Sequence, residues 1–74
     1  MSIHRYLHFR GMSQKAIAEA IGLPENSFSQ ICQGRKLLPI DVVPELADLL
    51  LVDVERVVRA FLATREDFLN ANPD

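Results

Sequence analysis

Tryptophan is absent from this 74-residue chain, cysteine occurs once and histidine occurs twice. The single thiol, Cys32, excludes an intramolecular disulfide, and His4 and His8 leave too few ligands for a closed four-ligand zinc site. The longest nearly apolar stretch, residues 46–54, contains two aspartates and is far shorter than the ~20 residues that span a bilayer. The N-terminal residues lack the apolar core of a secretory signal, so we expect a cytoplasmic protein in a reducing compartment, with no membrane partner.

The chain is also too short for two domains, and we expect one domain over residues 1–74. Hydrophobic residues make up 49% and charged residues 24%, a balance typical of a folded chain rather than a disordered one. A domain of this size buries only about 60% of its unfolded surface, so a partner subunit is a plausible source of added stability.

Positive charge is scarce in the chain as a whole, whose net charge is −2, whereas nucleic-acid-binding domains are usually basic. The charges are unevenly divided, however. Residues 1–37 hold five Lys and Arg against two Glu, and residues 38–74 hold three Arg against eight Asp and Glu. The first half can therefore present a locally positive face to an anionic partner, although an ordinary solvated surface produces the same asymmetry.

Turn and cap residues divide the chain into short helical segments, and no segment alternates as a strand does, so the predicted class is all-α. Five helices are expected: residues 2–10, the segment between Ser13 and Gly22, residues 24–33, a helix from 41 or 43 to about 50, and residues 53–69. Cys32 is expected to be buried on the third of these, and residues 70–74 are expected to be a frayed tail.

The second and third helices, with the tight turn between them, predict a helix-turn-helix at about residues 13–33. Here residues 11–50 resemble the Cro/repressor-type, or Xre-like, helix-turn-helix family of phage and bacterial regulators. The matching positions are Ser13-Gln14, Ala18, Gly22, Ser27-Phe28-Ser29, Ile31, Gly34-Arg35 and Pro44-Glu45-Leu46-Ala47. The resemblance implies a compact five-helix, lambda-repressor-like domain that binds operator DNA, commonly as a homodimer, and represses or activates transcription. The fifth helix extends this domain at its C-terminal end.

The resemblance also implies roles for individual residues. Gln14 matches a family glutamine that contacts a backbone phosphate, and Lys15, Arg35 and Lys36 fit further phosphate contacts. The positions on the third helix that match or flank the base-contacting positions are Glu25, Asn26, Ser27, Ser29, Gln30 and Gln33. Their side chains suit this task, because Asn and Gln can pair with adenine and Glu can accept from cytosine.

Two positions depart from the family pattern. Cys32 and Leu7 stand where the family commonly has an acid paired with a base, and we interpret them as an apolar replacement for that ion pair. Leu51 stands where a glycine usually ends the fourth helix, so a different turn is expected before the fifth.

The fifth helix carries more apolar residues than a small core needs, and this excess predicts a homodimer surface at Val57, Val58, Phe61 and Leu62, with core packing as the alternative explanation. No catalytic constellation is present, so we expect no enzyme, cofactor, metal or small-molecule substrate. A different class of function also fits the net acidity, namely a module that keeps the helix-turn-helix scaffold but binds another regulator, an antitoxin-like partner or a polymerase subunit.

Overall fold

The structure is a computed structural model that describes residues 11–72. Within this range the chain forms α2 (Gln14–Ile21), α3 (Glu25–Cys32), a short 3-10 turn η1 (Ile40–Val42), α4 (Val43–Leu50) and α5 (Val54–Ala71). None of the residues from 11 to 72 is in a strand, so the all-α prediction is confirmed for them. Four of the five predicted helices are therefore present, and the first, at residues 2–10, lies outside the described residues.

The predicted N-caps explain where two helices begin. The Ser13 hydroxyl accepts a hydrogen bond from the Ala16 N–H at 3.1 Å, and a carboxylate oxygen of Asp53 accepts from the Arg56 N–H at 3.3 Å. Each cap satisfies one of the backbone donors left unpaired in a first helical turn. The caps therefore set the starts of α2 and α5.

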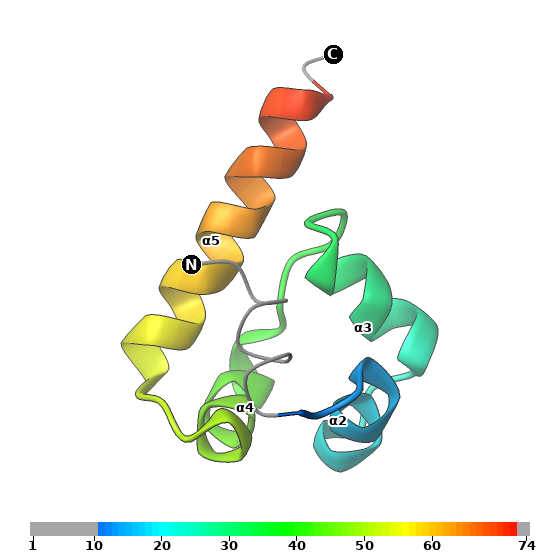
Figure 1. Ribbon diagram of the computed structural model, residues 1–74, viewed down its shortest axis with the longest axis vertical. Helices are drawn as coiled ribbons and strands as arrows, with labels where there is room; N and C mark the ends of the chain where they lie inside the picture. Colours follow the sequence, from blue (N-terminus) through cyan, green and yellow to red (C-terminus); the bar gives the residue numbers. More distant parts are fainter. Residues whose placement is uncertain (1–10, 73–74) are drawn as a thin grey trace.

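The core is built from one face of each helix (Figure 1). α2 packs against α3 and α4, α4 packs against α5, and α5 also contacts α3. The largest fully buried side chains are Phe28, Ile17, Leu46, Leu50, Val57 and Cys32. Because α2 and α3 are each anchored by such side chains, their mutual orientation is fixed, and α5 extends past the other helices at its C-terminal end.

The C-terminal end of α5 corrects one prediction. Residues 70 and 71 are helical rather than part of a frayed tail, and α5 ends at Ala71. Pro73 follows in the sequence, and a proline disfavours the helical conformation of the residue before it. Asn72 accordingly leaves the helix at φ −130°, while its side-chain amide donates to the Phe68 carbonyl at 2.9 Å.

The turn between α4 and α5 differs from what the missing glycine predicts. Leu51 adopts the left-handed conformation with φ 56°, as a glycine does at this place. Its N–H donates to Asp48 O at 3.3 Å, and the next N–H, from Val52, donates to Ala47 O at 3.1 Å. This hydrogen-bond pair is the Schellman motif that commonly ends helices. The ordinary turn is therefore kept, with a side chain in a backbone region that disfavours one.

Replacing Leu51 by glycine is expected to stabilise the protein by about 0.5–1 kcal/mol, because relief of a left-handed strain of roughly 1–2 kcal/mol exceeds glycine's entropy cost. The Leu51 side chain is 69% exposed, so little packing is lost. Thermal unfolding followed by circular dichroism measures the change. Leu51→Ala is the matched control, since it shortens the side chain but keeps Cβ; an equal gain from alanine would contradict this explanation.

Candidate nucleic-acid interface

The helix-turn-helix is formed by α2, a left-handed turn at Gly22 and α3. Gly22 has φ 78°, its N–H donates to Glu19 O at 3.3 Å, and the Leu23 N–H donates to Ala18 O at 2.9 Å. Ile17 on α2 and Phe28 on α3 are both fully buried in the core. The turn and these two anchors hold α3 across the end of α2 and leave its other side open to solvent.

The solvent side of α3 is polar throughout. Successive residues of a helix are rotated by about 100°, so Asn26, Gln30 and Gln33 lie on the side opposite the buried Phe28, Ile31 and Cys32. Glu25, Asn26 and Gln33 are exposed, whereas Ser27, Ser29 and Gln30 are half-buried. The side-chain amide of Gln33 donates to the Ser29 hydroxyl at 3.3 Å, along the same surface. This side of α3 thus presents amide, hydroxyl and carboxylate groups, which are the groups that pair with base edges in a major groove.

The predicted phosphate contacts fall into two places. Gln14 and Lys15 form the first turn of α2, where unpaired N–H groups favour an anion. Arg35 and Lys36 are exposed and follow directly after α3. Within residues 11–72 no hydrogen bond joins Gln14 or Lys15 to α3, so the two places are connected only through the packing of α2 on α3.

The turn after α3 rests on α5, a contact that the sequence did not predict. Gly34 is buried at φ 84°, and the Arg65 guanidinium donates to its carbonyl oxygen at 2.6 Å. The guanidinium carbons of Arg35 and Arg65 each lie 5.9 Å from the centre of the Phe68 ring. The available signal was the spacing of Phe61, Arg65 and Phe68, which places all three near one side of α5.

The residues predicted for a dimer surface separate into two groups. Val57 and Phe61 belong to the core, with 0% and 8% of their surfaces exposed. Val58 is half-buried and Leu62 is 61% exposed. The exposed part of the predicted dimer surface is therefore carried by the second pair, because the first supports it from below.

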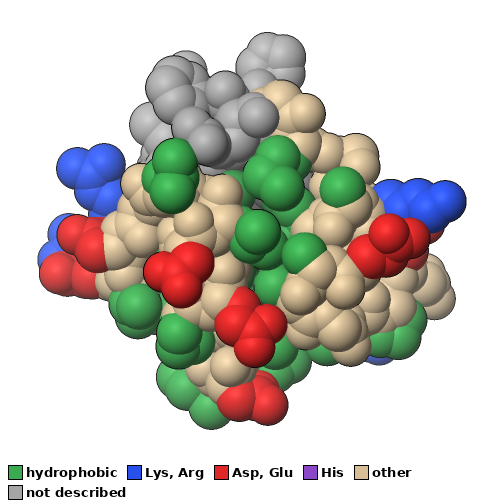
Figure 2. Space-filling model, turned by 90° about the horizontal axis from the view of Figure 1, so that it is seen from below, with side chains coloured by type: hydrophobic (Ala, Val, Ile, Leu, Met, Phe, Trp, Pro, Cys, Tyr) green, Lys and Arg blue, Asp and Glu red, His purple; other side chains and the backbone are tan. Residues whose placement is uncertain are grey.

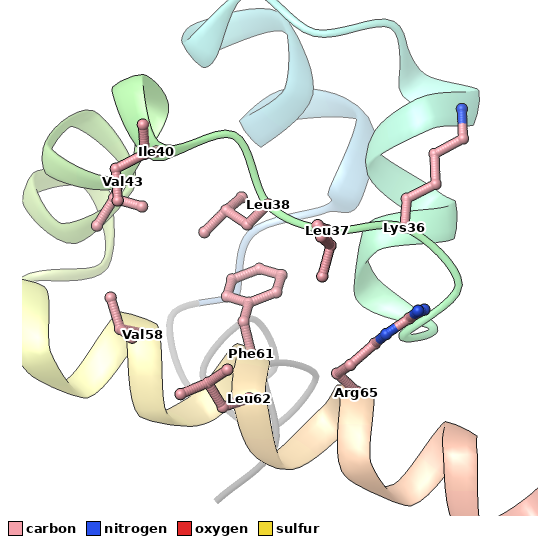
Figure 3. Close-up of a pocket in the computed structure, with 9 residues that line it drawn as sticks. All are labelled: Lys36, Leu37, Leu38, Ile40, Val43, Val58, Phe61, Leu62 and Arg65. Atoms are coloured by element: carbon pink, nitrogen blue, oxygen red, sulfur yellow. The ribbon is translucent and has the colours of Figure 1, made fainter.

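Val58 and Leu62 line an apolar groove of about 210 Å³ between α5 and the segment that links α3 to α4 (Figure 3). Leu37 and Ile40 on the other side of this groove are 73% and 82% exposed. Lys36 and Arg65 lie at the end nearest α3. The described part of the chain thus has a hydrophobic surface that no other described segment covers.

The remaining chemistry-bearing groups give no second site. Burial raises the pKa of the Cys32 thiol to about 12, so the thiol stays protonated and unreactive at neutral pH. Among residues 11–72 no group of His, Cys, Asp and Glu is arranged to hold a metal ion. No helix in that part of the chain is both long and apolar enough to cross a membrane.

Charge differs between faces of the molecule. Figure 2, which views the structure from below Figure 1, shows acidic side chains beside hydrophobic ones across the face, with basic side chains only near its edges. On α5, Arg59 is paired with Glu55 at 2.6 Å, which offsets its charge. A polyanion is therefore disfavoured on the face seen in Figure 2, and the cations that follow α3 offer the better place for one.

Comparison with known proteins agrees with this geometry. Residues 4–62 match a family described as a helix-turn-helix domain, and this match includes all of α2, α3 and α4. No curated protein matches the chain, and no solved structure matches it. The family match is consistent with the resemblance to Cro/repressor-type regulators and implies DNA binding. Because it covers most of the 74 residues, the chain belongs to the helix-turn-helix domain family.

Proposed function

We propose that this protein is a sequence-specific DNA-binding transcriptional regulator that occupies an operator as a homodimer. In this proposal α3 enters the major groove, and Asn26 and Gln30 contact base edges together with Glu25. Gln14, Lys15, Arg35 and Lys36 contact phosphates. The role requires no enzymatic activity, cofactor or metal, and a cytoplasmic location is part of the same proposal.

The observation that carries this proposal is the uncovered polar surface of α3, held by a rigid turn and by core anchors. Long polar side chains on the solvent side of a short, well-anchored helix contribute little to folding, because they make few contacts with the core. They do suit direct contact with bases, for which a bidentate pair contributes about 1–3 kcal/mol of discrimination. The geometry therefore supports sequence-specific rather than purely electrostatic binding.

A homodimer is supported by the small number of cations near α3. One copy offers Lys15, Arg35 and Lys36 to phosphates, and phosphate neutralisation supplies most of the non-specific affinity. Two copies double these contacts, and a two-fold pair of α3 helices fits half-sites spaced by about one helical turn.

We assign the apolar groove beside α5 to the second copy. A two-fold contact requires a surface that is complementary to itself. Val58, Leu62 and Leu69 follow one another at helical spacing along α5, and the second copy presents the same stripe to the groove. Leu62 and Leu69 are 61% and 48% exposed in a single copy, so their burial in the dimer favours association.

A titration of purified protein against mixed-sequence duplex DNA at increasing salt tests the electrostatic part of the proposal. Six cations from two copies predict that the logarithm of the binding constant falls with the logarithm of salt concentration with a slope of about −5, using about 0.9 per phosphate contacted. The mass of the complex, measured by analytical ultracentrifugation, is expected to correspond to two chains per site.

A slope near half this value with one chain per site would remove the dimer but keep DNA binding. Absence of binding at low salt would contradict the proposal as a whole. The uncovered groove and the net charge of −2 would then favour the second function, a module that binds another protein through this apolar surface. A pull-down with wild type and Leu62→Lys would follow, because a charge in the groove should abolish capture of such a partner.

A further inference from the structure

The turn after α3 lies directly against the C-terminal half of α5. A Cβ atom added to Gly34 would lie 2.7 Å from Thr64 O and 2.9 Å from the Phe68 Cβ. Such distances leave no room for a side chain, so the backbone of the turn packs on α5 without an intervening layer. The end of α3 and the middle of α5 thus form one rigid contact, although they are about thirty residues apart in the sequence.

Arg65 reinforces this contact by its hydrogen bond of 2.6 Å to the Gly34 carbonyl oxygen. Hydrogen bonds with a charged donor are shorter and stronger than neutral ones. The accepting carbonyl lies just past the C-terminal end of α3, where the helix dipole favours a cation. Arg65 therefore attaches α5 to the end of the helix that the proposed function places in the major groove.

Phe68 extends the contact to Arg35. The Arg35 guanidinium carbon is 5.9 Å from the centre of the Phe68 ring, within the range of a cation–π interaction. The Arg35 N–H also donates to Gln30 O at 2.9 Å, which fixes the backbone at this point. Backbone and side chain of Arg35 are both restrained, so less conformational entropy is lost when its guanidinium binds an anion.

We infer that Phe68 and Arg65 are positioning residues that hold Arg35 where it contacts a DNA phosphate at the end of α3. The inference rests on the proposed function and deepens it, because it assigns a role to the second half of α5. Residues 65 and 68 lie beyond the segment matched by the helix-turn-helix family, which ends at residue 62. The contact is thus an addition of this chain to the matched domain.

A double-mutant cycle in DNA binding tests the inference, with Phe68→Leu and Arg35→Ala as the two changes. Leucine keeps the Cβ that packs on Gly34 but removes the aromatic ring. Loss of a cation–π contact predicts two- to five-fold weaker binding for Phe68→Leu. Arg35→Ala removes one phosphate contact per chain and makes the salt slope shallower by about 0.9 for each. If Phe68 acts through Arg35, the double variant binds no more weakly than Arg35→Ala alone.

Asn70→Ala, an exposed change on the same helix, is the matched control and should leave binding unchanged. Urea unfolding of Phe68→Leu establishes that the variant is folded under the assay conditions. A Phe68→Leu effect of equal size with and without Arg35 would overturn the inference while leaving the proposed function in place. Failure of the wild-type protein to bind DNA at low salt would overturn both.

Discussion

Replacing Gly34 by alanine is expected to destabilise the protein by at least about 3 kcal/mol, whereas the same change at Gly22 should cost only about 1–2 kcal/mol. Both glycines are left-handed, with φ 84° and 78°, so the strain of a side chain on the backbone is similar. They differ in their surroundings. Nothing lies within 4 Å of a Cβ added at Gly22, but one added at Gly34 meets the backbone of α5 at 2.7 Å.

The contact at Gly34 cannot be relieved by a side-chain rotation, because the nearest atom is the main-chain oxygen of Thr64. Either the turn or α5 has to move, and both the Arg65 hydrogen bond and the packing of Phe68 are weakened when it does. A chain of this length is stabilised by only roughly 4–11 kcal/mol in total. A loss of 3 kcal/mol therefore brings the domain close to unfolding at moderate temperature.

Urea unfolding of the two variants beside the wild type, followed by far-ultraviolet circular dichroism, measures the difference. A Gly34→Ala variant that is already unfolded without urea agrees with the prediction, provided that Gly22→Ala remains folded. Equal losses of stability at the two positions would show that backbone strain alone accounts for the effect and that α5 does not close on the turn.

Replacing Asn26 or Gln30 by alanine is expected to reduce discrimination between operator and mismatched duplexes by about 1–3 kcal/mol at one position of each half-site. Both residues lie opposite the buried side of α3, so truncation removes the base contact without opening the core. Their folding stability should change by less than about 0.5 kcal/mol, as is usual for surface substitutions.

Lys36→Ala is the matched control, since Lys36 is exposed but lies past the end of α3. A lysine acting on a phosphate carries no sequence information, so its loss should weaken binding to all duplexes alike. Measured affinities for the operator and for single-base variants separate the two classes of residue. A uniform loss for Asn26→Ala would place Asn26 with the phosphate contacts instead.

The local parts of the fold could be predicted from the sequence because their signals lie within a few residues. Ser13 and Asp53 cap the helices that they precede, and Gly22 ends α2, as predicted. The polar side of α3 follows in the same way from helical spacing, since the apolar Phe28, Ile31 and Cys32 identify the buried side.

The parts that could not be predicted depend on contacts between distant segments. An apolar stripe on α5 is visible in the sequence, but only the packing on α4 decides that Val57 is buried while Leu62 is exposed. Nothing near Gly34 indicates that Arg65 reaches its carbonyl. At Leu51 the local preference is overridden, because the turn that packs α5 on α4 requires a left-handed residue whatever its side chain.

Selection of duplexes from a randomised pool by the wild type, Asn26→Ala and Lys36→Ala tests the central claim, that α3 contacts bases, most directly. We expect the wild type to enrich a two-fold symmetric site whose half-sites are about 10 base pairs apart. Lys36→Ala should enrich the same site with weaker retention, and Asn26→Ala should lose the preference at one position in each half. No enrichment by the wild type, or an unchanged site and affinity for Asn26→Ala and Gln30→Ala, would contradict the assignment of α3 as the recognition helix.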